Sequence, residues 1–236
     1  TIEIGKSTLR NQFIFLFNNP ADLGDFISKV KLKINLKESV VAPDDLKYFT
    51  GVSAAPKQPI NISGLVSGTV NNLHVKQFTA VIGQTSIHGD LMLDGLPVLD
   101  ETFIQASVEH SKLHFNDLDF LIPSRVVNRL KALGIVQIKG EFTGFTNDFV
   151  ANAGFYSTIG EIDSDVNLKI DQQNFDQSTY SGNLSMKNFD LGRFLSDTAR
   201  FQKITMNGNI RGKGLSLTTA DFNLKGTVAS AGILGY

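Results

Sequence analysis

The stretch Ile62-Ser63-Gly64-Leu65-Val66-Ser67-Gly68 carries the pattern that decides the fold: apolar, polar, glycine, polar, apolar, polar, glycine. Only Leu65 departs from the polar phase. Apolar residues that alternate with other residues predict a β-strand with one apolar face. Glycines spaced by four lie on the same side of a strand, here the apolar side. There they either bend the strand or let a backbone or ligand approach, and bending is the favoured interpretation. The two further copies are Ile138-Lys139-Gly140-Glu141-Phe142-Thr143-Gly144 and Met206-Asn207-Gly208-Asn209-Ile210-Arg211-Gly212.

A second element keeps step with the first, because Asp45-Leu46, Asp117-Leu118 and Asp190-Leu191 lie 72 and 73 residues apart. A fixed period of this length predicts one elongated array of stacked supersecondary units. The chain opens directly in an alternating run, so we expect a segment of a longer protein. The expected units are 1–42 (partial), 43–116, 117–189 and 190–236 (partial).

Alternation continues outside the glycine pairs, as in Val30–Leu36, Ile87–Leu93 and Ile162–Ile170. The apolar phase slips by one residue between Val75 and Phe78, and again within Leu217–Phe222, which predicts a bulge or turn at each place. Short helices are expected between strands, where capping residues precede apolar stripes. Their ranges are Asp22–Ile27, Pro43–Phe49, Ser124–Leu133 and Leu191–Asp197.

Composition excludes several classes of function. The net charge of −1 and the absence of a basic stripe give no footprint for nucleic acid. The chain has no cysteine, which rules out disulfides, thiolate metal sites and a cysteine nucleophile. No apolar run approaches the ~20 residues of a membrane-spanning helix.

Signs of enzymatic or metal chemistry are weak, so we expect neither catalytic residues nor a metal or cofactor. No nucleophile elbow or phosphate-binding glycine loop is present. The histidines His74, His88, His110 and His114 have no carboxylates at a matching metal spacing. Asp117 with Asp119, and Asp163 with Asp165, lack the glycine-containing acidic loop of a calcium site, and a solvated strand face is the favoured interpretation.

A sheet with one apolar face has to cover that face. The predicted fold is mainly β, an elongated repeat array of curved antiparallel strands that forms a trough with an apolar interior and a few short helices between units. Apolar contact is non-directional, so such a trough suits acyl chains. The alternative is a closed core with no ligand. The candidate lining residues are Ile62, Val66, Val70, Ile138, Phe142, Phe155, Val166, Leu168, Met206 and Ile210.

The order of these elements resembles a known family. A strand leads into a short Asp-Leu helix, then into a glycine-paired strand, then into further long strands. The stretches Val41–Phe49 and Tyr180–Leu195 carry most of the resemblance, and Met206–Gly214 continues it. Over residues 38–230 the chain is similar to the AsmA-like superfamily, in particular the translocation and assembly module (TamB) proteins.

The resemblance implies a U-shaped, taco-like β-groove in a periplasmic protein that an N-terminal helix, absent from this chain, anchors in the inner membrane. Such proteins span toward the outer membrane, carry phospholipid or support insertion of outer-membrane proteins. The implied partners are phospholipid acyl chains and, through parts outside this chain, an outer-membrane barrel assembly protein.

The favoured function is a non-enzymatic, lipid-conducting or envelope-assembly segment. One alternative is a structural β-solenoid or sandwich whose apolar face is wholly self-packed. Another is a periplasmic chaperone that binds unfolded strands by pairing at an exposed sheet edge.

Overall fold

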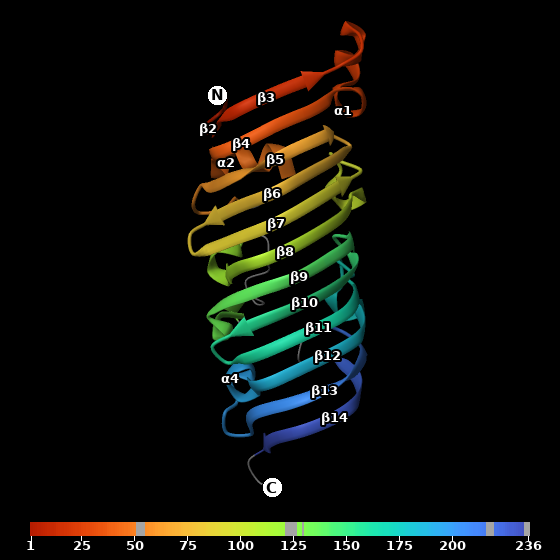
Figure 1. Cartoon of the computed structure of the whole chain (residues 1–236). Helices are drawn as coiled ribbons and strands as arrows, with labels where there is room; N and C mark the ends of the chain where they lie inside the picture. Colours follow the sequence, from red (N-terminus) through yellow and green to blue (C-terminus); the bar gives the residue numbers. More distant parts are fainter. Residues whose placement is uncertain (51–54, 121–126, 129, 216–219, 234–236) are drawn as a thin grey trace.

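The described strands of the computed structural model form one 14-stranded antiparallel sheet (Figure 1). The structure describes residues 1–50, 55–120, 127, 128, 130–215 and 220–233. Strand follows strand in chain order across the sheet, except that β3 pairs with β4 beside β2. The strands are β1 (Ile2–Ile4), β2 (Ser7–Leu9), β3 (Asn11–Leu16), β4 (Lys31–Val41), β5 (Ile60–Thr69), β6 (Asn72–Ile82), β7 (Thr85–Asp94), β8 (Phe103–His114), β9 (Ile135–Phe145), β10 (Asp148–Ser157), β11 (Gly160–Lys169), β12 (Thr179–Asp190), β13 (Phe201–Lys213) and β14 (Asp221–Ile233).

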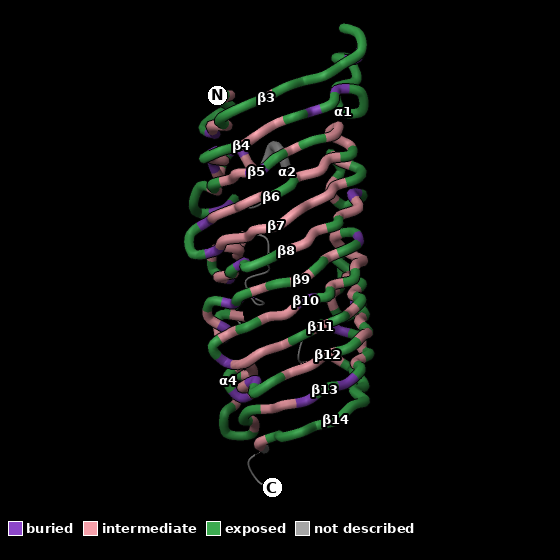
Figure 2. The backbone as a smooth tube through the Cα atoms, viewed as in Figure 1, coloured by how far each residue is buried: buried purple, intermediate pink, exposed green. Residues whose placement is uncertain are grey.

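The sheet is open, because the strands at its two ends do not pair with one another in the described chain. This confirms a mainly β fold with an elongated antiparallel array. The chain exposes 14034 Å² of surface. A compact monomer of 25.8 kDa exposes about 10,500 Å². The excess agrees with a sheet that no second sheet covers, and Figure 2 shows few fully buried residues along the strands.

Short helices lie after β4, β8 and β12, with four strands between one and the next, and further short helices lie after β3, β7 and β11 with the same period. Helices are found at the expected places near Asp22, Pro43 and Leu191. Of the expected helix over Ser124–Leu133, residues 124–126 and 129 lie outside the described residues; Val127, Asn128 and Leu130 are helical, and its end forms η4. The described helices are too short and too polar to cross a lipid bilayer. They are η1 (Pro20–Asp25), α1 (Phe26–Lys29), α2 (Pro43–Thr50), η2 (Leu99–Glu101), η3 (Phe115–Leu118), η4 (Lys131–Leu133), η5 (Phe175–Gln177) and α4 (Leu191–Leu195).

The repeated aspartates hold structure at these interruptions. Asp117 Oδ2 accepts hydrogen bonds from the backbone of Gln84 and Thr85 and from the Thr85 hydroxyl. In the unit before, Asp45 accepts from the backbone of Lys6 and the hydroxyl of Ser7 in the same way. Each carboxylate therefore joins the end of one strand to the hairpin turn of an earlier pair.

Several of the described strands are bulged, and four of the bulges share one backbone geometry. The register shifts at Glu38 in β4, Gln77 in β6, His110 in β8 and Asn188 in β12, and each of these residues has a φ between 48° and 51°. The bulge at Gln77 confirms the predicted slip between Val75 and Phe78. The second predicted slip falls partly on residues 216–219, which lie outside the described part of the chain.

Neighbouring strands stabilise the bulges. The backbone N–H of Gln77 donates to Asp90 Oδ1 at 2.8 Å, and that of Asn188 donates to Thr205 Oγ1 at 3.0 Å. The bond from Gln77, together with Lys76, holds the pKa of Asp90 below its usual range. A bulge adds a local bend and extra twist to a strand. Repeated bulges therefore curve this sheet.

Candidate functional site

The strand registers place apolar side chains in unbroken rows that run across one face of the sheet. In the row through Phe142, each residue is the cross-strand partner of the next, from β3 to β14. None of its members is polar or charged. At about 4.8 Å between strands, the row is roughly 50 Å long. We call it the Phe142 row: Phe13, Ile34, Val66, Val75, Leu91, Ala106, Phe142, Ala151, Val166, Gly182, Ile210 and Leu224.

A second row lies beside the first on the same face and is also unbroken. Its only polar atom is the Tyr180 hydroxyl, and partial burial of that side chain raises the pKa of Tyr180. The rings of Phe142 and Phe149 link the two rows, with their centroids 4.5 Å apart. This second row, the Phe149 row, comprises Phe15, Leu32, Gly68, Leu73, Leu93, Ile104, Gly144, Phe149, Leu168, Tyr180, Gly212 and Phe222.

A row of mostly small residues lies on the other side of the Phe142 row. Gly64, Gly89, Gly140, Gly208 and Gly226 belong to it. A Cβ on Gly64 would lie 3.1 Å from the Cα of Phe78 on the neighbouring strand. A Cβ on Gly140 would lie 2.6 Å from the Cβ of Ala153. These glycines are therefore explained by close approach of neighbouring strands, which was the alternative to the bending role that the sequence favoured.

A fourth row lies beyond the small residues and includes Ile62, Ile138, Phe155 and Met206. The short helices cover part of it. Phe155 packs against a buried cluster, and Met206 is only 6% exposed. The buried members of that cluster are Phe115, Val127, Leu133, Val136, Ile159 and Phe189. We call the four rows together the apolar face.

The candidate lining residues can now be placed. Val66, Phe142, Val166 and Ile210 belong to the Phe142 row, and Leu168 belongs to the Phe149 row. Ile62, Ile138, Phe155 and Met206 belong to the fourth row, where the helices leave less room for a ligand. Val70 lies in the turn after β5 rather than in a strand. Whether any of them contacts a ligand stays a prediction.

Sequence reasoning missed several members of these rows, among them Val75, Leu91, Leu93 and Ile104. The signal was present, since all four belong to alternating strands. Register was the missing information, because only cross-strand pairing shows which strands continue a row.

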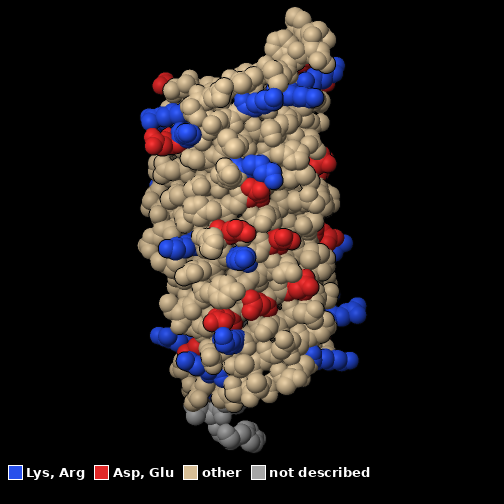
Figure 3. Space-filling model, viewed as in Figure 1, with Lys and Arg blue, Asp and Glu red and all other residues tan. Residues whose placement is uncertain are grey.

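The opposite face of the sheet is mostly polar. The partners of Thr143 on that face include Gln105 and Val150, and Asn167, Ser181 and Arg211 continue the line. The face seen in Figure 3 carries scattered Lys, Arg, Asp and Glu side chains of both signs. The described rows of the apolar face carry no charged residue. The two faces therefore differ sharply in character.

The acidic residues and histidines considered as metal ligands lie on the strand surface or make structural contacts. Asp163 and Asp165 lie exposed on β11, as expected for a solvated strand face. His114 lies 3.5 Å from Asp117, whose carboxylate holds the Thr85 turn. Among the described residues, no three His, Asp or Glu side chains lie together so as to hold a metal ion.

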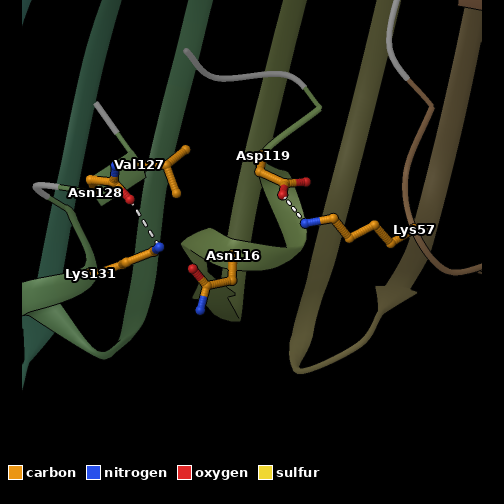
Figure 4. Close-up of a pocket in the computed structure, with 6 residues that line it drawn as sticks. All are labelled: Lys57, Asn116, Asp119, Val127, Asn128 and Lys131. Carbon is orange, nitrogen blue, oxygen red and sulfur yellow. Dashed lines mark hydrogen bonds and ion pairs between the residues drawn. The ribbon is translucent and has the colours of Figure 1, made fainter. Parts of the chain in front are cut away.

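A polar pocket of about 440 Å³ lies where the short helices meet the sheet (Figure 4). Lys57 and Lys131 enter it from opposite sides, with Asn116 between them. Lys57 forms an ion pair with Asp119, and Lys131 Nζ donates to Asn128 Oδ1 at 2.9 Å. The sixth lining residue, Val127, belongs to the buried cluster. We call this the rim pocket.

No family model, curated protein sequence or solved structure matches the chain. The resemblance to the AsmA-like superfamily therefore remains a prediction.

Proposed function

We propose that this chain is a segment of an AsmA-like periplasmic protein, whose curved sheet forms a U-shaped groove that holds phospholipid acyl chains along the apolar face. The observation that carries the proposal is the continuity of the Phe142 and Phe149 rows from β3 to β14. A path of roughly 50 Å with no charged side chain presents an acyl chain with the same environment at every strand.

The exposed surface and the bulges support the groove. A closed core would bury both rows against a second layer, whereas every described strand belongs to a single sheet. Burial of apolar surface is worth about 25 cal/mol per Å², so an acyl chain that covers part of the face is held without any specific polar contact. In this account the protein is not an enzyme. It carries lipid toward the outer membrane, or supports assembly there with a partner that binds other parts of the protein.

The test is to extract and quantify phospholipid from the purified protein by mass spectrometry, with two variants for comparison. Ile210→Asp places a charge in the Phe142 row. Asn209→Asp places the same charge on the other face of the same strand. We expect the lipid content to fall several-fold in Ile210→Asp alone, with the circular dichroism of both variants unchanged. No lipid in the wild-type protein, or equal lipid in both variants, would contradict the proposal.

One observation favours a second candidate function, the strand-binding chaperone. β14 is an edge strand, and Phe222 and Val228 on it are 56% and 54% exposed. An open edge of this length can pair with an unfolded strand through backbone hydrogen bonds. Peptides with alternating apolar residues would then bind, and N-methylation of their backbone would abolish binding. If N-methylated peptides bind equally well, this candidate fails.

A further inference from the structure

The rim pocket combines features that suit an anionic group. Two ammonium groups and one carboxylate line it, which leaves a net positive charge. Lys131 Nζ donates to the neutral side-chain oxygen of Asn128, and no acidic side chain of the described residues lies within ion-pair distance of it. An ammonium has three N–H donors, so Lys131 retains two for a ligand.

The amide side chains add neutral donors. Asn116 lies between the two lysines in Figure 4, and Asn116 and Asn128 each have an NH₂ group. Lys57 is tied to Asp119, but its remaining donors are free to contact a second acceptor. A tetrahedral anion with several acceptor oxygens can use all of these donors together, and charge-assisted bonds of this kind are the strong ones.

The size and position of the pocket also matter. Its volume of about 440 Å³ exceeds the roughly 30 Å³ that one water occupies by more than tenfold. Val127 forms one wall and packs into the cluster that covers one margin of the apolar face. A polar group in the pocket would therefore lie beside the apolar rows, as the head group of a groove-bound lipid requires.

We propose that the rim pocket binds a phosphate group through Lys57, Lys131 and the two asparagine amides. The phosphate is that of a lipid head group or a free phosphate, and the lipid source rests on the proposed function. Asp119 lines the same pocket and can accept from a head-group amine.

The test is calorimetric titration of the whole chain with three probes: inorganic phosphate, glycerophosphoethanolamine and a short-chain diacyl phosphatidylethanolamine below its micelle concentration. The variant is Lys131→Gln, which keeps a polar side chain and removes a charge that no described acid balances. The matched control is Lys139→Gln on β9, whose side chain is also exposed but lies away from the pocket.

We expect Lys131→Gln to weaken phosphate binding about fivefold to tenfold, the effect of losing one charged hydrogen bond at an exposed site, and Lys139→Gln to leave it unchanged. Binding should also weaken at 0.5 M salt, because the Debye length is then only a few ångströms and the attraction between the lysines and the phosphate is screened. Tighter binding of the diacyl probe than of inorganic phosphate would identify a lipid head group. Tighter binding of inorganic phosphate than of either ester would identify free phosphate.

Equal affinities in wild type and Lys131→Gln for every probe would overturn the pocket assignment. Failure of the pocket assignment can be distinguished from failure of the proposed function. If only the pocket assignment is wrong, lipid still copurifies with Lys131→Gln. If only the lipid groove is wrong, inorganic phosphate still binds in a Lys131-dependent way while no lipid copurifies with the wild-type protein.

Discussion

Gly140 and Ala153 face each other across β9 and β10 so closely that a Cβ on Gly140 would lie 2.6 Å from the Ala153 Cβ and 2.4 Å from the carbonyl oxygen of Asn152. Both atoms are held by the strand backbone and have little room to shift. The small residue at 140 is therefore a condition for the two strands to approach as they do.

Gly140→Val should lower the free energy of unfolding by about 1–3 kcal/mol, the usual cost of overpacking. The measurement is thermal or denaturant unfolding followed by circular dichroism. Gly24→Val is the matched control, because a Cβ at Gly24 meets no atom within 4 Å. Equal stability of Gly140→Val and the wild type would show that the strands can separate at no cost.

Asp117→Ala should expose the turn between β6 and β7. The substitution leaves the N–H groups of Gln84 and Thr85 without their acceptor, in a place where Thr85 is only 1% exposed. Unsatisfied buried donors cost about 1–3 kcal/mol. Amide hydrogen exchange should accelerate at these two residues. Asp163→Ala, on the exposed side of β11, should leave their exchange unchanged, and similar exchange in all three proteins would refute the role given to Asp117.

The equivalent carboxylate in the preceding unit gives a pH-dependent prediction. The hydroxyl of Ser7 donates to Asp45 Oδ2 at 2.7 Å and, with the backbone of Lys6, holds the pKa of Asp45 below its ordinary value of 3.8. Because the pKa is lower in the folded state, the carboxylate stabilises the fold at every pH above 3.8. This stabilisation is lost as pH falls through the folded-state pKa.

Ser7→Ala should therefore be less stable than the wild type at pH 6, and the difference should shrink as the pH falls below 3.8. Denaturant unfolding at a series of pH values measures it, with Ser181→Ala on the exposed side of β12 as a control. A difference that does not change with pH would mean that the hydroxyl acts independently of the charge on Asp45.

Much of the sheet was predictable from local pattern. Alternation and the glycine pairs predicted an antiparallel array with one apolar face, and the slip between Val75 and Phe78 predicted the bulge at Gln77. The bulges at Glu38 and His110 were harder to predict. The residues after them that return to the apolar face, Ser39 and Ser111, are polar, so the sequence shows no shift in the apolar alternation there.

Long-range contacts left no local signal. Asp117 was expected on a solvated face, yet its carboxylate accepts from Thr85, 32 residues away. The rim pocket joins Lys57 with Asp119, 62 residues apart; Lys57 does not stand out in the sequence, and Asp119 was considered only as a candidate calcium ligand. Such partners are set by the way that the helices pack back on the sheet after every fourth strand, which only the three-dimensional arrangement reveals.

The most direct test of the groove is photo-crosslinking in cells with a photoreactive residue placed in turn at Phe142, Thr143, Asn209 and Ile210. Phe142 and Ile210 belong to the Phe142 row, while Thr143 and Asn209 lie on the other face of the same strands. We predict that phospholipid is crosslinked from Phe142 and Ile210 and not from the other two. Crosslinks to protein alone at Phe142 and Ile210, with no lipid at either position, would contradict the account.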